Sequence, residues 1–291
     1  MFTQRTIFYS RAGVGRGKLT QNYLKEHEKD CRIIISIVIK IVINMEAGEW
    51  KVVGHAIFEQ RSGILGVAVV TACGVIRPEQ LAGLGELPKK VSVLGMKLTT
   101  RQTLIFLINE ADLTVFQQEI QKIGLQIGVF GNIVRNVKGC AGSDQWCRRS
   151  FGDAFGLGVR IQEQFMNQPA PKDFKISTAG CPRGCTDPYC ADFGVIAVGA
   201  DRFDIYLGGR GGSKVPRHGQ RILEQISGEQ VMKVLDFVLQ KYRQLGEENE
   251  RLCRVIDRCG IDSFIPAPDV YIDEHSQPEE LDDFSAFLAG Q

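Results

Sequence analysis

The hydrophobic positions between residues 63 and 130 follow patterns typical of strands and helices in turn. Ile64–Ala72 is apolar and β-branched, which predicts a buried strand. Pro78 is well placed to begin a helix, and a second helix has apolar residues at helical spacing and ends at Gly124. Further strands are predicted at Val91–Leu98, at Thr103–Ile108 and in the sequence LQIGVF. The order βαββαβ is ferredoxin-like and predicts an α+β half domain over residues 45–134.

A second set of elements is predicted over residues 135–266. Apolar positions at helical spacing predict a helix through Ala154, Leu157, Ile161 and Phe165. The sequence FKISTAG predicts a strand, and FGVIAVGA and FDIYLGG predict a strand pair closed by the loop Gly208–Lys214. Ser227 precedes a long helix, with Gln230 in capping-box position, and a shorter helix follows over Leu252–Ile256. The buried stripe of the long helix is predicted to be Val231, Val234, Leu235, Val238 and Tyr242. This part is predicted to be a second α+β domain.

The two ends of the chain differ in composition from the rest. Residues 1–44 hold eight Lys or Arg against three Asp or Glu. Their apolar run Ile33–Asn44 is too short to span a membrane and is interrupted by Lys40. We interpret residues 1–44 as an N-terminal extension, either an edge strand or a disordered segment, or as a sequence upstream of a natural start at Met45. Residues 267–291 are predicted to form an acidic, solvated tail.

The overall composition is that of an ordinary globular protein of 291 residues, with 44% hydrophobic and 24% charged residues. A net charge of +1 argues against general nucleic-acid binding. Nine cysteines form an odd set in a long chain, which favours a metal or cluster in a reducing compartment over a disulfide framework. We therefore expect a cytoplasmic protein that binds neither nucleic acid nor membrane.

Four of the cysteines form two close pairs, Cys140/Cys147 and Cys181/Cys185. Glycine and basic residues are their neighbours in the sequence. Two such pairs suit a four-coordinate soft-metal site. The second pair has three intervening residues, which suits zinc or an iron–sulfur cluster. The first pair has six, wider than the usual zinc spacing, so a [4Fe–4S] cluster is favoured while zinc stays open.

Several motifs in a fixed order resemble the sulfite/nitrite reductase family that couples sirohaem to a [4Fe–4S] cluster. The motifs are KLTTRQT from Lys97, GNIVRNV from Gly131, the two cysteine pairs, PKDFKIS before the second pair, and GGRGG. The resemblance covers about residues 63–264, one ferredoxin-like half followed by one sirohaem and [4Fe–4S] domain. TTRQ alone is a weak signal, but the full ordered set is highly specific.

The resemblance implies roles for individual residues. The cluster ligands would be Cys140, Cys147, Cys181 and Cys185. Cys185 would also be the axial ligand of the sirohaem iron, which couples the two cofactors directly. The cationic residues of the substrate face would be Arg101, Arg135 and Lys175, of which the two arginines also bind the cofactor. Gly209, Arg210 and Gly211 would meet the carboxylates of the macrocycle.

Some of these residues also have a purely structural interpretation. Arg101 could form a strand-end salt bridge, Lys175 could face solvent, and GGRGG could be an ordinary hairpin turn. Cys190 is expected to be a buried thiol rather than a fifth ligand.

The sequence departs from the family pattern at three points. The gap AGSDQW in the first cysteine pair is one residue longer than usual. Asp173 replaces one of two lysines before the second pair, which would weaken anion binding. The chain has one unit where the large reductases have two. One interpretation is a symmetric homodimer in which Arg101 and Arg135 cross to the partner's cofactor, and the alternative is a one-unit monomer.

The resemblance therefore implies an oxidoreductase that passes six electrons to sulfite or nitrite. No flavin or nicotinamide motif is visible, so the electrons would come from a separate ferredoxin or flavoprotein. One alternative is a non-catalytic iron–sulfur or haem redox or sensor protein that has lost turnover through Asp173. Another is a structural module that binds zinc.

Overall fold

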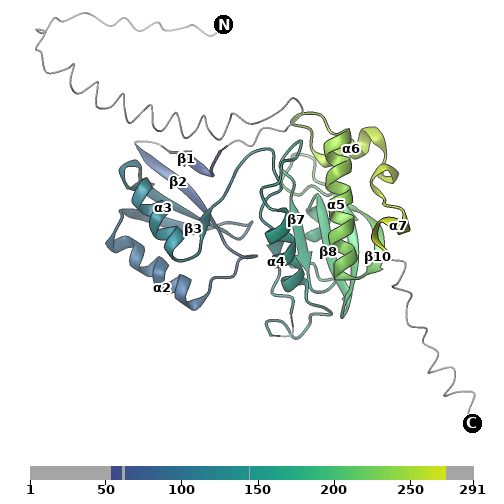
Figure 1. The fold of residues 1–291 in the computed structure, drawn as a ribbon, viewed down its shortest axis with the longest axis horizontal. Helices are drawn as coiled ribbons and strands as arrows, with labels where there is room; N and C mark the ends of the chain where they lie inside the picture. Colours follow the sequence, from purple (N-terminus) through teal and green to yellow (C-terminus); the bar gives the residue numbers. More distant parts are fainter. Residues whose placement is uncertain (1–53, 61–62, 144, 273–291) are drawn as a thin grey trace, which may run out of the picture. The chain divides into compact units, whose positions relative to one another are not determined.

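The computed structural model describes residues 54–60, 63–143 and 145–272, which belong to one compact unit (Figure 1). The expected N-terminal extension, Met45 and residues 273–291 of the expected acidic tail lie outside the described residues.

The first sheet has the ferredoxin-like order that the sequence predicts. Its antiparallel strands are β1 Ile57–Glu59, β2 Ile64–Val70, β3 Val93–Leu98, β4 Thr103–Asn109 and β5 Gln126–Ile127. The strands of the predicted motif lie in the order β5, β2, β4, β3. Strand β1 pairs with β2 along the same edge as β5 does. The short strand β1 was not expected from the sequence, because three residues give no readable alternation.

Two helices complete this half, α2 Pro78–Glu86 and α3 Leu113–Lys122, and they lie side by side in Figure 1. Alternate residues of β2, among them Val67 and Val69, are buried against Phe116 and Ile120 of α3. Gly124 adopts a left-handed φ of 69° directly after α3, as a helix stop requires. The predicted βαββαβ half domain is confirmed.

The second sheet mixes parallel and antiparallel pairs. Its strands are β6 Lys138–Gly139, β7 Ile176–Ala179, β8 Phe193–Gly199, β9 Arg202–Leu207 and β10 Gln220–Ile226, in the spatial order β10-β9-β8-β7-β6. The β6–β7 and β7–β8 pairs are parallel, whereas β9 runs antiparallel to β8 and β10. The sequence did not predict β6, which is too short, or β10, which has two register shifts.

The helices of this half are α4 Ala154–Phe165, α5 Gly228–Leu245, α6 Leu252–Cys259 and α7 Pro268–Tyr271. Short 3-10 helices lie at Leu87–Lys89, Glu110–Asp112, Pro188–Cys190 and Ile261–Phe264. The capping box of α5 is present, because Gln230 N donates to Ser227 Oγ at 3.2 Å and Ser227 N donates to Gln230 Oε1 at 2.8 Å. Such a cap stabilises a helix by about 1 kcal/mol. Tyr271 of α7 packs on the core, so the first residues of the expected tail are folded.

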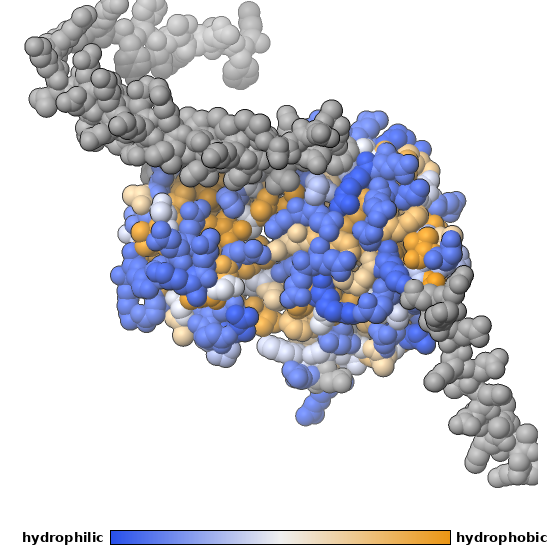
Figure 2. Space-filling view, viewed as in Figure 1, coloured by the Kyte–Doolittle hydropathy of each residue, from blue (hydrophilic) through white to orange (hydrophobic). Residues whose placement is uncertain are grey.

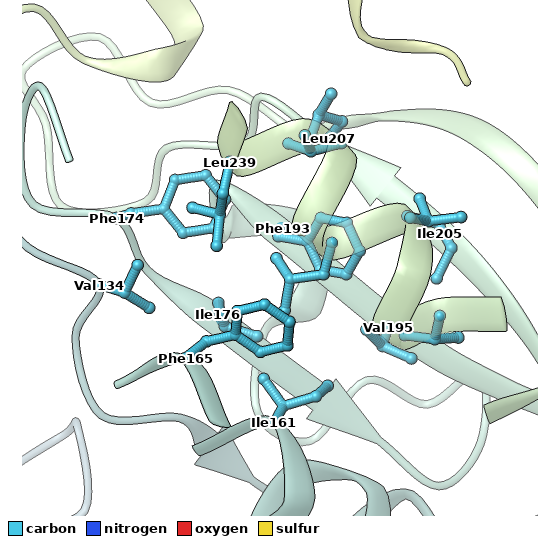
Figure 3. Close-up of a cluster of buried hydrophobic side chains, with 14 of the residues drawn as sticks. Val134, Ile161, Phe165, Phe174, Ile176, Phe193, Val195, Ile205, Leu207 and Leu239 are labelled. Atoms are coloured by element: carbon cyan, nitrogen blue, oxygen red, sulfur yellow. The ribbon is translucent and has the colours of Figure 1, made fainter. Parts of the chain in front are cut away.

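The second half has a core of its own, shown in Figure 3. Side chains from the sheet meet side chains from α4 and α5 there, and the labelled ones are all almost fully buried: Val134, Ile161, Phe165, Phe174, Ile176, Phe193, Val195, Ile205, Leu207 and Leu239. The stripe predicted for α5 is also buried throughout. Two hydrophobic cores and two sheets confirm the α+β class.

Hydrophilic residues cover most of the face shown in Figure 2. No helix in the described part of the chain is long and apolar enough to cross a membrane.

Candidate functional site

Two parallel strands bring the cysteine pairs together. β6 and β7 pair in register, with Lys138 opposite Ser177 and Gly139 opposite Thr178. Cys140 directly follows β6, and Cys181 follows β7 after one intervening residue. Because the carboxyl ends of parallel strands meet at one edge of a sheet, the two cysteine loops start side by side.

Hydrogen bonds join the two loops at their starting points. Cys140 N donates to Thr178 O at 3.1 Å, and Gly180 N donates to Cys140 Sγ at 3.0 Å. The loops cross at Gly142 and Gly180, where a Cβ atom on Gly142 would lie 2.6 Å from Gly180 Cα. A Cβ atom on Gly180 would also collide with Ser150 Oγ. Only glycine fits at this crossing, which explains why both cysteine pairs are bedded in glycine.

The long gap in the first cysteine pair is folded into tight turns. Cys147 N donates to Ser143 O at 2.9 Å, and Ser150 N donates to Cys147 O at 3.0 Å. Phe151 N then donates to Gly180 O at 2.7 Å, which returns the chain to the second loop. Trp146, inside the gap, is 59% exposed. The longer gap is thus compatible with a position of Cys147 beside the second pair.

The loop after β7 is fixed by threonine and glycine. Thr186 Oγ1 donates to Thr178 O at 2.8 Å, and Ser177 Oγ donates to Thr186 O at 2.7 Å. Gly184 has a left-handed φ of 61°, which lets the loop turn back between Cys181 and Cys185. Cys185 is held next to β7 and is exposed.

The other three thiols lie within electrostatic range of Cys140. Burial raises the pKa of the Cys140 thiol, the Gly180 N–H lowers it, and the negative charges of Cys185, Cys181 and Cys147 raise it further. Every cysteine in the described part of the chain is a free thiol.

The chemistry of these thiols fits an iron–sulfur cluster. A zinc ion with bonds of about 2.3 Å would hold four sulfurs about 3.8 Å apart. Across the described residues, no three Cys, His, Asp or Glu side chains are arranged to hold one metal ion. Four thiols, three of which lie within electrostatic range of Cys140, are the soft donor set that a [4Fe–4S] cluster takes. The donor set therefore fits the cluster.

The two predicted arginines lie in the junction between the halves. Arg101 follows β3, and its guanidinium donates to the carbonyls of Asn136 and, at 3.5 Å, of Ile176. Its Nε is buried without a hydrogen-bond partner, and no ion pair of Arg101 occurs among the described residues. Burial, together with the charge of Arg135, lowers the pKa of Arg101 to about 10, so it stays protonated at neutral pH. The expected alternative of a strand-end salt bridge is not what the structure contains.

Arg135 lies one residue before Asn136, and its guanidinium stacks over Phe130 at 5.1 Å from the ring centroid. Arg135 N donates to Phe174 O at 2.8 Å, which fixes the residue beside the strand that leads to β7. Burial lowers the pKa of Arg135, while the charge of Asp173 raises it.

Lys175 belongs to a chain of alternating charges that includes a residue the sequence did not single out. Lys175 Nζ lies 3.2 Å from Asp173 Oδ2, and the other oxygen of Asp173 accepts from Arg251 Nη1 at 2.7 Å. Arg251 Nη2 in turn donates to Asp192 Oδ2 at 2.7 Å. Lys175 is partly exposed and paired rather than simply facing solvent.

The electrostatics of this chain keep Asp173 ionised. Burial alone would raise the pKa of Asp173, but Arg251 and Lys175 outweigh it and lower the pKa. Burial alone would lower the pKa of Arg251, and Asp192 and Asp173 raise it instead. Complete burial raises the pKa of Asp192, whose Oδ1 has no hydrogen-bond partner. Asp173 is thus neutralised by Arg251, which weakens the expectation that it repels an anion.

The cations and the thiols lie at opposite ends of the same strands. Arg101 contacts Ile176 at the amino end of β7, whereas Cys181 lies five residues further on. The structure groups the three predicted cations near the amino end of β7, whereas Cys181 follows its carboxyl end.

The GGRGG sequence is the turn between β9 and β10, and it packs against the segment after Cys185. A Cβ atom on Gly209 would lie 2.6 Å from Ala191 O and would collide with Tyr189 O. Gly211 N donates to Cys190 O at 3.1 Å. Arg210 exchanges backbone bonds of 2.9 Å with Arg217. The loop therefore belongs to the connection between two antiparallel strands, and it lies beside the second cysteine loop.

Known proteins share these features. Residues 130–275 match the family described as "Nitrite and sulphite reductase 4Fe-4S domain", and residues 58–123 match "Nitrite/Sulfite reductase ferredoxin-like half domain". The NAD(P)H nitrite reductase of Emericella nidulans is 31% identical over 200 residues, which are 68% of this chain but 18% of that protein. The assimilatory-type sulfite reductase of Nitratidesulfovibrio vulgaris is 24% identical over 196 residues, which are 67% of this chain and 87% of that protein.

A solved structure titled as dissimilatory sulfite reductase I has a TM-score of 0.62 at 13% identity and covers 80% of each chain, which supports the fold. The two family matches occur in the order and at the places where the ferredoxin-like half and the cysteine loops lie. The chain therefore belongs to the sulfite and nitrite reductase family, and the two cofactors expected from the sequence, sirohaem and a [4Fe–4S] cluster, are the cofactors of that family.

Proposed function

We propose that this protein reduces a small oxyanion, sulfite or nitrite, by six electrons at sirohaem coupled to a [4Fe–4S] cluster. The observation that carries the proposal is that one chain holds both Cys140 with three other thiols within its electrostatic range and a buried group of cations without an excess of carboxylates. A cluster that only passed electrons would not need the second group.

In this proposal Cys140, Cys147, Cys181 and Cys185 would hold the cluster, and Cys185 would also hold the sirohaem. The exposure of Cys185 supports its double role, because a shared ligand must be reachable from outside the cysteine loops. Gly209, Arg210 and Gly211 would hold the carboxylates of the macrocycle from the neighbouring turn. When bound, the two cofactors supply electron storage and the iron that carries the substrate.

Arg101, Arg135 and Lys175 would bind the anion and the macrocycle. Buried cations act strongly because little water screens them, and Arg101 Nε is a donor with no partner in the described part of the chain. With Arg251 they form a group of four cations beside the two carboxylates of Asp173 and Asp192. The surplus of positive charge suits a dianionic or monoanionic substrate.

Lys175 is the best proton donor of this group. Its ammonium is a compact acid on a flexible stem, whereas arginine rarely releases a proton. Asp173 holds Nζ in place at 3.2 Å and is itself held by Arg251. The Asp173 substitution is then compatible with turnover, because the acid positions the proton donor instead of facing the substrate alone.

We further propose that the working form is a symmetric homodimer. In a single chain Arg101 lies at the amino end of β7, whereas the second cysteine pair follows its carboxyl end. A two-fold arrangement would place Arg101 and Arg135 of one protomer against the cofactor held by its partner's cysteines. Light scattering of the holo-protein tests this, and a strict monomer would exclude the crossed arrangement.

The electron donor is proposed to be a separate protein, a ferredoxin or a flavoprotein. Trp146 and Phe151, on the first cysteine loop, are exposed large aromatic side chains. Arg148 and Arg149 are exposed beside Cys147. An apolar patch edged by arginines next to the cluster suits docking of an acidic protein.

The decisive experiment uses anaerobically purified protein. Sirohaem gives a Soret and a far-red absorption band, a cluster alone gives broad brown absorbance, and zinc gives none. Oxidation of reduced methyl viologen in the presence of sulfite or nitrite then tests turnover. Protein that holds sirohaem but oxidises viologen with neither anion would be a redox or sensor protein, and the reductase proposal would be wrong.

A further inference from the structure

The outer edge of strand β6 is bonded by side chains rather than by another strand. β6 is the last strand of its sheet and pairs with β7 on one side only. Along a strand, alternate peptide groups point to the same edge. Cys140 N faces β7, so the N–H groups of Val137 and Gly139 face the opposite, unpaired edge.

Two glutamine side chains meet these groups. Val137 N donates to Gln162 Oε1 at 3.1 Å. Gly139 N donates to Gln102 Oε1 at 2.9 Å, and Gln102 Nε2 donates to Gly139 O at 2.7 Å. The side-chain amide of Gln102 thus makes the same donor and acceptor pair that a neighbouring strand would make. We call Gln102 and Gln162 the glutamine clamp.

Thr71 joins the two members of the glutamine clamp. Thr71 Oγ1 donates to Gln102 O at 3.1 Å, and Gln162 Nε2 donates to Thr71 O at 3.0 Å. Thr71 and Gln162 are buried, so the bonds are shielded from water. The network ties the ferredoxin-like half and helix α4 to the residue before Cys140.

The backbone of Gln102 has an unfavourable conformation that supports a specific role. Its φ is 60°, in the left-handed region that is unfavourable for a non-glycine residue of this kind. The backbone carbonyl of Gln102 accepts from Thr71, and its side-chain amide bonds the backbone of Gly139. The side-chain bonds to Gly139 offset the backbone cost. A glycine at position 102 would avoid the backbone strain but could not make these bonds.

We infer that Gln102 is a positioning residue for Cys140, fixing the first cluster ligand against the half that carries Arg101. Arg101 and Gln102 are adjacent and both bond the segment 136–139, because Asn136 Nδ2 donates to Arg101 O at 2.7 Å. One loop therefore sets the positions of a substrate-side cation and of a cluster ligand together. This inference rests on the proposed assignment of Cys140 as a ligand.

The test compares Gln102→Asn with the wild-type holo-protein. Asparagine tolerates a left-handed φ but is one methylene too short to reach both Gly139 atoms. The first measurement is the rate at which an iron chelator bleaches the cluster under native conditions. Loss of the bonds is expected to make bleaching about tenfold faster, the factor for one to two net hydrogen bonds. The second is the electron paramagnetic resonance spectrum of the reduced cluster, which is expected to change because one ligand is displaced.

Two controls separate a positioning role from general destabilisation. Gln121→Asn makes the same change at an exposed site on α3 and is expected to behave as wild type. Val67→Ala weakens the core of the ferredoxin-like half without touching the glutamine clamp. If Gln102→Asn bleaches no faster than Val67→Ala at an equal loss of melting temperature and keeps the wild-type spectrum, the inference is wrong.

Cys140→Ser distinguishes failure of this inference from failure of the proposed function. If Cys140→Ser keeps the full cluster, the ligand assignment itself is wrong. Suppose that Cys140→Ser loses the cluster, while Gln102→Asn has the wild-type bleaching rate and the wild-type electron paramagnetic resonance spectrum. In that case only the positioning role of Gln102 is overturned.

Discussion

Gly142 and Gly180 touch backbone to backbone, so that a Cβ atom on either would lie 2.6 Å from the Cα of the other. This contact joins the two cysteine loops at the point where both leave the sheet.

We predict that Gly180→Ala separates the cysteine loops. Its Cβ atom would collide with Gly142 and with Ser150 Oγ, both fixed by backbone bonds. Crowding of this kind typically costs about 1–3 kcal/mol, and we expect the cluster content to fall as well. Iron and sulfide analysis with thermal unfolding measures both. Gly85→Ala, where a Cβ atom meets nothing within 4 Å, is the control and should keep the cluster. A fully loaded, equally stable Gly180→Ala protein would contradict the prediction.

The first cysteine pair provides the sharpest test of the ligand set. We predict that Cys147→Ser loses the [4Fe–4S] cluster, because a hydroxyl is a poor soft-metal ligand. Cys190→Ser is expected to keep the cluster, since Cys190 lies against Gly211 and is assigned no ligand role. Absorbance and iron content of the anaerobic proteins give the answer. Retention of the whole cluster by Cys147→Ser would mean that another residue completes the set.

Asp173 should stabilise the protein in a pH-dependent way. Its pKa is lowered in the folded state from the ordinary value of 3.8, so its contribution is fully present above about pH 4 and is lost as the pH falls through the lowered value. Asp173→Asn is expected to cost about 2–3 kcal/mol at pH 7, because Arg251 loses a partner. The difference in unfolding free energy from wild type should shrink in acid, whereas Asp262→Asn, at an exposed site, should show no such trend. A difference that is constant from pH 7 to pH 3 would refute the ion-pair role.

Arg135 tests the proposed reductase activity. Arg135→Ala is expected to lower kcat/KM for the oxyanion by about 10²–10³, as for removal of one preorganised charge from an active site. The sirohaem and cluster spectra should be measured in parallel, so that loss of cofactor is not mistaken for loss of catalysis. Arg202→Ala, at an exposed position on β9, should retain wild-type kinetics. Unchanged turnover in a loaded Arg135→Ala protein would remove this arginine from the site.

The sequence by itself determined much of the local structure. Alternating and helical spacing gave the order βαββαβ, the helices α4 and α5 and the capping box at Ser227, because these features depend on neighbouring residues. It also marked the four cysteines and the cations Arg101, Arg135 and Lys175 as candidate site residues, since their motifs are continuous in the chain. The short strand β6 and the irregular strand β10 were missed, because their pairing is decided by distant strands.

Only the tertiary structure decided which of these residues meet. Arg251 is separated from Asp173 by 78 positions and Gln162 from Thr71 by 91, and neither carries a motif that marks its partner. The parallel pairing of β6 and β7 brings the thiols to one end and leaves the cations at the other. Local sequence patterns determine which segments form helices and strands. Buried charges and unpaired strand edges need ion-pair or hydrogen-bond partners, and the packing of the whole chain decides which groups provide them. That is why the family and its cofactors could be predicted from the sequence, whereas the glutamine clamp and the ion pair of Asp173 with Arg251 could not.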